Sequence, residues 1–250
     1  MATVNVPDFL PSANGLRFAN DFPKVPLIQI PVPGTTIRLG DASDGLCGGM
    51  TYLTADLARA GLPPPPGTDP PSAGPLFEYL VKRAFQSFDL PDGPLQYLLW
   101  MGLPDRDALF GLHGVVWRTL TQEWPKVRAD LDGGTLSPLG LVRTRSFNPK
   151  DLGLNHQVLA YGYELDESAK KLRVRVCDPN FPGDDGVAVQ VSLADPIEAS
   201  SFTYVAGDHP VRGFFRTAYR WNDPSSVAGS PASLATGLDG SEIQSDQEPT

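Results

Sequence analysis

The sequence is poor in the residues that most disulfide and metal sites require. Its 250 residues include only two cysteines and three histidines. Two cysteines cannot build the disulfide framework of a small secreted domain, and the histidines lack the spacing of zinc ligands. We therefore expect no metal and no other cofactor. A reducing, cytoplasmic compartment is the simplest interpretation of this cysteine content.

Long apolar runs and an excess of positive charge are also missing. No stretch approaches the roughly 18 consecutive apolar residues of a transmembrane helix. Residues 1–15 lack the charged start and apolar core of a secretory signal, although a protein exported without a leader would look the same. The formal net charge of −9 argues against nucleic acid or an anionic membrane as a partner. We expect a soluble protein, and nothing in the sequence indicates its oligomeric state.

Proline and glycine, in contrast, are abundant at 26 and 25 residues, which predicts many irregular connections. Residues 1–40 read as an extended segment that packs on the core, since its many prolines suit edge strands and loops. Residues 41–222 contain the regular elements of one domain. Residues 223–250 hold five acidic residues and no lysine or arginine, so we expect a disordered acidic tail.

Hydrophobic periodicity divides the domain into helices followed by strands. Apolar residues from Met50 to Ala60 repeat at helical spacing, and Gly61 ends this helix, which begins at Cys47. Further helices are predicted over 76–88, 95–101 and 124–131. Runs rich in β-branched and aromatic residues predict strands over 136–142, 157–163, 172–177, 187–193 and 213–221. This order predicts an α+β fold in which N-terminal helices pack on a C-terminal antiparallel β-sheet.

Cys47 is the first candidate for chemistry, because it lies at the predicted start of a helix. A free thiol is mostly neutral at pH 7, whereas the partial positive charge of a helix N-terminus favours the thiolate. Gly48 and Gly49, which follow, are poor helix formers. We therefore expect a substrate or a packed strand to approach the backbone closely there. The alternative is a small, buried, structural cysteine, which is common for free thiols.

Two later residues have the chemistry to activate this thiol. His156 opens one predicted strand, and Asp178 follows the next strand, 22 residues later and after one hairpin. Adjacent antiparallel strands bring such ends side by side, so the carboxylate can orient the imidazole and favour its charged form. The structural alternatives are a satisfied histidine at a strand end and a turn opened by Asp178. Strand alternation should point Cys177 away from Asp178 into the core, where it cannot pair with Cys47.

Five segments add a further signal: GLCGGM (45–50), WPKVRADLDGG (124–134), SPLGLV (137–142), NHQVL (155–159) and VCDPN (176–180). Together they resemble the papain-like fold, and most closely the branch related to bacteriocin-processing (C39-like) peptidases. The resemblance covers roughly residues 40–195. It implies that Cys47 is the nucleophile, that His156 is the general base and acid, and that Asp178 orients the imidazole.

Residues next to Cys47 and His156 are candidates for substrate binding. We expect Gly48, Gly49 and Asn155 to contact the substrate. The family usually places a glutamine about six residues before the cysteine as a donor to the oxyanion, whereas this sequence has Asp41, whose charge would repel an oxyanion. The backbone N–H of Cys47 can still supply one donor.

The hypothesis that follows is a cysteine peptidase-like thiol hydrolase with a catalytic triad, acting on a peptide or an amide-containing small molecule. Two alternatives stay open. An acyltransferase would use the same triad and pass the acyl group to an amine. A non-catalytic papain-like binding domain would keep the fold without an oxyanion donor.

Overall fold

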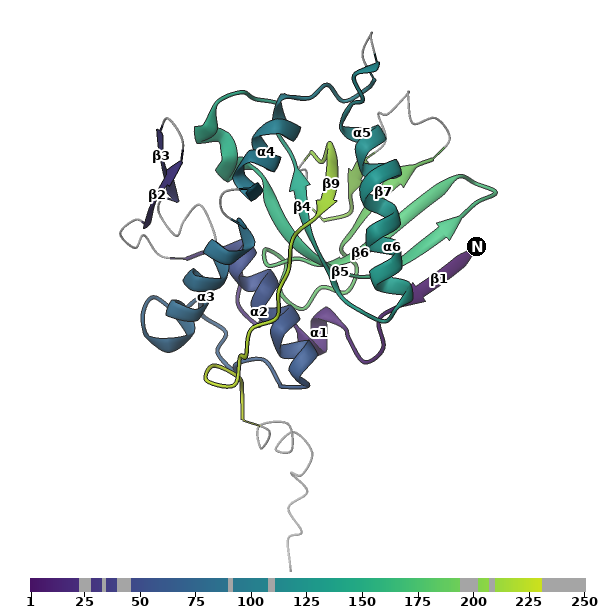
Figure 1. Ribbon diagram of the computed structural model, residues 1–250. Coiled ribbons are helices and arrows are strands. Elements are labelled where there is room, and N and C mark those ends of the chain that lie inside the picture. Colours follow the sequence, from purple (N-terminus) through teal and green to yellow (C-terminus); the bar gives the residue numbers. More distant parts are fainter. Residues whose placement is uncertain are drawn as a thin grey trace, which may run out of the picture.

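The computed structural model of the chain describes residues 1–22, 46–89, 92–107, 111–193, 202–206 and 210–230, and the backbone of residues 28–32 and 35–39. Within these residues most helices precede the strands of a large antiparallel sheet, as Figure 1 shows. The α+β class predicted from the sequence is confirmed in this form.

The helices follow the apolar periodicity of the sequence. They are α1 (Pro11–Asn14), α2 (Cys47–Ala60), α3 (Gly74–Ser87), α4 (Asp92–Gly102), α5 (Val115–Arg118) and α6 (Trp124–Asp132), with a 3₁₀ helix (η4) at Pro149–Leu154. α2 has the predicted bounds, and Gly61 ends it in the left-handed conformation with φ 64°. α3 and α4 match the helices predicted over 76–88 and 95–101 to within three residues at each end.

The helix predicted over 124–131 is confirmed as α6, whereas the helical turns directly before it are not predicted by the sequence pattern. A π-helical turn (η3, Thr119–Glu123) joins α5 directly to α6. Pro125 lacks an N–H and so disrupts an ordinary α-helix. The wider turn just before it, in which the N–H of Trp124 bonds to the carbonyl of Thr119, accommodates the proline. α6 therefore begins at Trp124 with Pro125 in its first turn, as predicted, and α5 and the π turn precede it without a break.

The large sheet has the strand order β8-β7-β6-β5-β4-β9, and its neighbouring strands are antiparallel. Its strands are β4 (Ser137–Val142), β5 (His156–Asp166), β6 (Lys171–Cys177), β7 (Ala188–Ser192), β8 (Phe202–Tyr204) and β9 (Gly213–Arg216). Five of these correspond to predicted strands, although β9 ends at Arg216 rather than at residue 221. The short strand β8 is not predicted by the sequence pattern.

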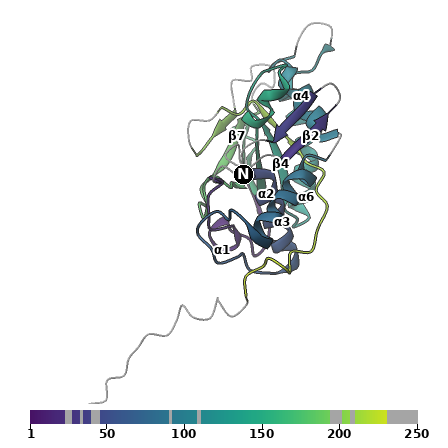
Figure 2. The ribbon, with the colours of Figure 1, turned by 90° about the vertical axis from the view of Figure 1, so that its left-hand side faces the viewer.

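Residues 1–22 of the segment predicted over 1–40 pack on the core and include the short helix α1. β1 (Ala2–Asn5) pairs with the second half of β5, on the edge that β4 occupies along the first half. Phe18 and Phe22 are buried against α2 and α3. The rest of the segment includes a separate hairpin of β2 (Ile28–Val32) and β3 (Thr35–Leu39). Figures 1 and 2 both show this hairpin on the side of the molecule where α4 lies.

The sheet is strongly curled. β8 and β9 are the first and last strands of the order, so a flat sheet would separate them by about 24 Å at roughly 4.8 Å per strand. Phe202 of β8 and Phe214 of β9 nevertheless have ring centroids 6.2 Å apart. The concave side encloses a core that includes fully buried Leu141, Val158 and Val174. Curling therefore brings residues from opposite ends of the strand order close together.

Helix α3 packs very closely on the first turn of α2. A Cβ at Gly49 would lie 2.1 Å from the carbonyl oxygen of Leu80, and one at Gly48 would lie 2.1 Å from Oγ of Ser87. The expected close approach at these glycines comes from α3, and at Gly48 also from Gln157 of β5, whose Oε1 would lie 3.0 Å from the Cβ. The two glycines thus allow α2 to be fixed against α3 at its N-terminal end.

A buried ion pair holds the same two helices to the chain that follows β9. Nε of Arg83 in α3 lies 2.8 Å from Oδ2 of Asp56 in α2, and the two side chains are 2% and 0% exposed. Asp56 also accepts hydrogen bonds from the Tyr219 hydroxyl (2.8 Å) and the Asn222 N–H (3.0 Å). Residues 217–222 are therefore fixed across the helices, and Figure 1 shows this segment running down between α2 and α6.

Part of the segment assigned to the tail belongs to the folded domain. Val227 is 8% exposed and packs in the apolar cluster between α2 and α3. The N–H of Gly229 bonds to the carbonyl of Pro63 at 3.0 Å. The folded domain thus extends at least to residue 230, because Val227 is an apolar side chain that the core buries. Residues 231–250 lie outside the described residues.

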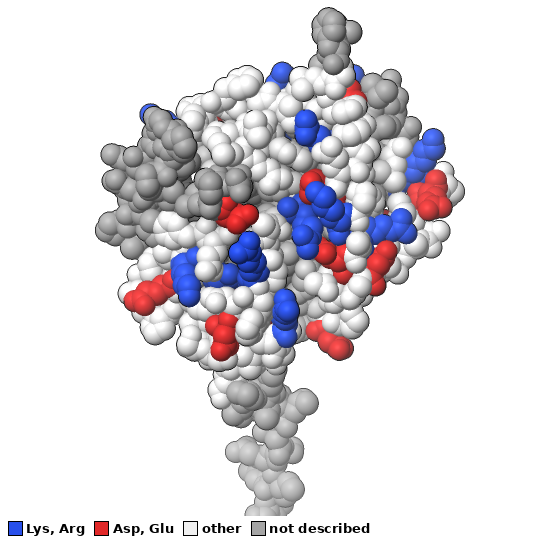
Figure 3. Space-filling model, in the orientation of Figure 1, with Lys and Arg blue, Asp and Glu red and all other residues white. Residues whose placement is uncertain are grey.

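Basic and acidic side chains alternate on the face shown in Figure 3. Arg216 of β9 lies 2.5 Å from Asp130 of α6, and Arg128 lies 3.4 Å from Asp132. Opposite charges are thus neighbours on this face. Among the described residues, no helix is long and apolar enough to cross a membrane.

The buried ion pair between α2 and α3 leads to a stability prediction. We expect Arg83→Met to lower the free energy of unfolding by about 3–5 kcal/mol, because the Asp56 carboxylate would stay buried without its cation. Urea unfolding of the variant measures this loss. Arg128→Met is the matched control, since its exposed pair with Asp132 should contribute less than about 1 kcal/mol. Equal losses in the two variants would contradict the structural role of the buried pair.

Candidate active site

Cys47 is the first residue of α2 and is only partly buried. The first N–H of the helix that bonds within it is that of Met50, which donates to the carbonyl of Leu46 at 2.9 Å. The N–H groups of Cys47, Gly48 and Gly49 therefore lie at the positive end of the helix outside its internal hydrogen bonds. A thiol in this position is accessible and is stabilised in its ionised form.

The structure brings His156 and Asp178 together. His156 begins β5, and Asp178 directly follows β6, the antiparallel neighbour of β5. Nε2 of His156 lies 2.7 Å from Oδ1 of Asp178, and the two residues are 4% and 1% exposed. A carboxylate can only accept a hydrogen bond, so this contact places a proton on Nε2. Nδ1 is then the ring nitrogen that is left for the thiol.

Asp178 is held ionised by several hydrogen-bond donors. The hydroxyl of Tyr204 in β8 donates to Oδ2, and the N–H of Asn180 donates to Oδ1 at 2.7 Å. Burial alone would raise the pKa of Asp178, but the charge of His156 and these hydrogen bonds bring the pKa below its ordinary value. The carboxylate is therefore negative at neutral pH.

The imidazole and the thiol interact as a charged pair. Burial tends to lower the pKa of His156, yet the charges of Asp178 and Cys47 raise it to about 9. Burial would likewise raise the pKa of the Cys47 thiol, but His156, by its charge and a hydrogen bond, and the Gln157 N–H bring it below its ordinary value. The two shifts have the same cause, and both favour a thiolate beside an imidazolium at neutral pH.

Asn20 connects the two halves of the site. Its side-chain oxygen accepts a hydrogen bond from the N–H of Leu46 at 2.7 Å, immediately before Cys47. Its side-chain nitrogen donates to Oδ1 of Asn180 at 3.2 Å, in the loop after Asp178. Asn20 therefore fixes the start of α2 relative to the loop that carries the carboxylate.

Gly48, Gly49 and Asn155, which we expect to contact the substrate, lie next to Cys47 and His156 in the chain. Gly48 and Gly49 are buried against α3, as described above. Asn155 precedes His156, and its side chain accepts from the N–H of Arg143 at 3.1 Å and donates to the carbonyl of Leu152 at 3.1 Å. These contacts fix the chain just before His156. A role of the three residues in substrate binding stays a prediction.

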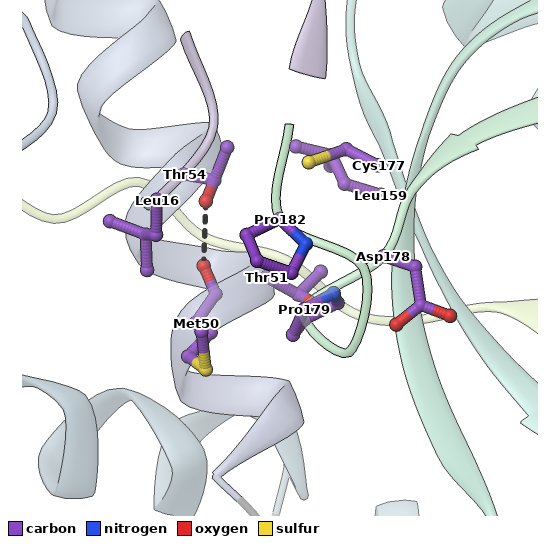
Figure 4. A pocket seen from close by; sticks show the side chains of 9 residues that line it. All are labelled: Leu16, Met50, Thr51, Thr54, Leu159, Cys177, Asp178, Pro179 and Pro182. Atoms are coloured by element: carbon purple, nitrogen blue, oxygen red, sulfur yellow. Dashed lines mark hydrogen bonds between the residues drawn. The ribbon is translucent and has the colours of Figure 1, made fainter. Parts of the chain in front are cut away.

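Cys177 is a free thiol that points away from the triad. Figure 4 shows its sulfur beside a small cavity that is also lined by Leu16 and Met50, while the Asp178 carboxylate turns the other way. Burial raises the pKa of the Cys177 thiol to about 12. Both cysteines are free, so the prediction that Cys177 does not pair with Cys47 is confirmed.

Sequence reasoning did not find Tyr204 or Asn20. Tyr204 reaches Asp178 because the sheet curls, and Asn20 lies 26 residues before Leu46 in the chain. No local motif marks either residue. Asp41, which stands where the family has its glutamine, lies outside the described residues. Within the part of the chain that the structure describes, no three histidine, cysteine or acidic side chains are placed to hold a metal ion.

Comparisons of the chain with protein-family models, with curated proteins and with solved structures find no match. Its function therefore has to be inferred from the geometry of the site.

Proposed function

We propose that this chain is a papain-like cysteine hydrolase that cleaves a peptide or amide bond. The observation that carries the proposal is a buried imidazole held between an ionised carboxylate and a half-buried thiol at a helix N-terminus. The order of these parts along the chain supports the papain-like assignment. The cysteine begins a helix of the N-terminal half, the histidine begins a later strand, and the aspartate follows the next strand.

In this mechanism the Cys47 thiolate attacks the carbonyl carbon of the substrate, and the carbonyl oxygen becomes an oxyanion. The His156 imidazolium then gives its Nδ1 proton to the leaving nitrogen, the C–N bond breaks, and a thioester on Cys47 remains. Neutral His156 next takes a proton from water, whose oxygen attacks the thioester. Cleavage of the C–S bond releases the acid and restores the thiolate and the imidazolium. An amine in place of water would make the same chemistry an acyl transfer.

The first turn of α2 supplies donors for the oxyanion. The N–H groups of Cys47, Gly48 and Gly49 are free of intrahelical bonds, and the helix dipole adds positive charge at the same place. In the proposed mechanism the backbone N–H of Cys47 lies beside the carbon that its own sulfur attacks. Asp178 keeps the proton on Nε2 of His156 and so leaves Nδ1 to exchange protons with substrate.

Selective alkylation tests whether Cys47 is an activated thiolate. At pH 6 we expect iodoacetamide to modify Cys47 at least about tenfold faster than Cys177, because only Cys47 has a lowered pKa. Peptide mass spectrometry measures the two rates in the same sample, so Cys177 is an internal control.

His156→Gln should slow the modification of Cys47 at pH 6 by about tenfold or more, because the variant removes the positive charge that favours the thiolate. Circular dichroism and urea unfolding establish that the variant is folded. Equal rates in the variant and the wild type would contradict the proposed pair. A Cys47 that reacts only near the pKa of an ordinary thiol would contradict it as well.

Tyr204→Phe tests the support of the carboxylate. Loss of the hydroxyl removes the contact that fixes Oδ2 of Asp178, so the carboxylate should be held less firmly against His156 and the pKa of His156 should fall from about 9. A fall of about one pH unit is the size expected for one hydrogen bond to a charged group. The basic limb of the pH profile of Cys47 alkylation reports this shift. Tyr163→Phe is the matched control, since the hydroxyl of Tyr163 donates to Asp132 at 2.6 Å, away from the site. The same shift of the His156 pKa in both variants would refute the role of Tyr204.

A further inference from the structure

Arg143 lies beside the proposed catalytic residues, although the mechanism above does not use it. Leu141 of β4 is paired directly with His156 of β5, and Arg143 follows two residues later. Residues paired across two strands share a face, and so do residues two apart in one strand. Arg143 therefore lies on the same face of the sheet as His156, immediately beyond the end of β4.

Two further contacts fix Arg143 at this place. Its N–H donates to the side chain of Asn155, the residue before His156, at 3.1 Å. Its guanidinium carbon lies 5.7 Å from the centre of the Tyr204 ring. The Tyr204 hydroxyl donates to Asp178, so only one side chain separates the guanidinium from the His156–Asp178 pair.

The guanidinium of Arg143 lacks the acceptor that Nε and Nη2 have in Arg175 and Arg216. Among the described residues, its Nε and Nη2 atoms are buried and have no hydrogen-bond acceptor. In Arg216 the Nε and Nη2 atoms, which form one edge of the guanidinium, bind Asp130. They lie 2.5 and 3.2 Å from the two carboxylate oxygens of Asp130. Arg175 likewise uses Nε and Nη2 to bind Glu164. A buried guanidinium edge without an acceptor is unfavourable, which points to an acceptor that the described residues do not provide.

We propose that Arg143 binds a carboxylate of the substrate close to the bond that Cys47 attacks. This inference rests on the proposed hydrolase function and adds a substrate class to it, namely amides that carry a carboxylate near the scissile bond. The parallel N–H groups of Nε and Nη2 match the two oxygens of a carboxylate. Nε and Nη2 are buried, whereas the residue as a whole is only partly buried. The carboxylate can belong to a free C-terminus or to an acidic side chain, and the two sources can be tested separately.

Matched acidic and neutral alkylating probes test this proposal. Bromoacetyl-alanine and bromoacetyl-alaninamide differ in a main-chain carboxylate, whereas the bromoacetyl α-amides of glutamate and glutamine differ in a side-chain carboxylate. The rate of Cys47 modification is measured for all four at pH 6.5. Both members of a pair attack the same thiolate, so the acid-to-neutral ratio cancels any effect of a variant on the thiolate itself.

We expect Arg143→Gln to lower this ratio by about tenfold for at least one pair, the size of one charge-assisted hydrogen bond. The affected pair then identifies the source of the carboxylate. Arg145→Gln is the matched control, because this substitution removes the same charge from an exposed residue two positions away. The acid-to-neutral ratio of this variant should change less than about twofold, because exposed charges are screened.

An unchanged ratio in Arg143→Gln, or an equal fall in Arg145→Gln, would overturn the assignment of Arg143 while leaving the proposed function intact. A wild-type Cys47 that reacts with none of the four probes would overturn the hydrolase function itself, and the role of Arg143 with it.

Discussion

The candidate site depends on one buried pair of charges, His156 and Asp178, whose side chains are 4% and 0% exposed. Removing each charge from water costs several kcal/mol unless other polar groups compensate. Here compensation comes from the Tyr204 hydroxyl and the Asn180 N–H on the carboxylate, and from the Cys47 thiolate beside the ring. The charges therefore persist only because three separate segments of the chain converge on them.

The architecture explains how those segments converge. The curl of the sheet carries β8, and with it Tyr204, over the start of β5. Asn20 ties the start of α2 to the loop after β6, and the two glycines after Cys47 allow α3 to press against the same turn. The Asp56–Arg83 pair fixes α2 and α3 to the chain beyond β9. Both halves of the molecule thus hold the thiol and the imidazole at one place.

The sequence predicts those parts of this arrangement that depend on local pattern. Helical spacing of apolar residues gives α2, and one hairpin between His156 and Asp178 is enough to predict that they meet, because antiparallel strands return to their start. Tyr204 and Asn20 cannot be found this way. Their contacts depend on the curl of the sheet and on a loop far along the chain, neither of which leaves a periodic signal. α5 and the π turn are missed for a local reason, since Pro125 correctly marks the start of α6 and gives no sign of the helical turns before it.

The charge state of His156 tests the account most directly. Nitrogen-15 NMR of the imidazole ring, with His156→Gln to assign the signals, follows both ring nitrogens as the pH is raised. The account predicts that His156 stays protonated on both nitrogens through neutral pH and titrates at about 9, with Nε2 keeping its proton above that value. A ring that titrates near its ordinary value of about 6.5, or that is neutral throughout, would contradict a thiolate–imidazolium pair in this fold.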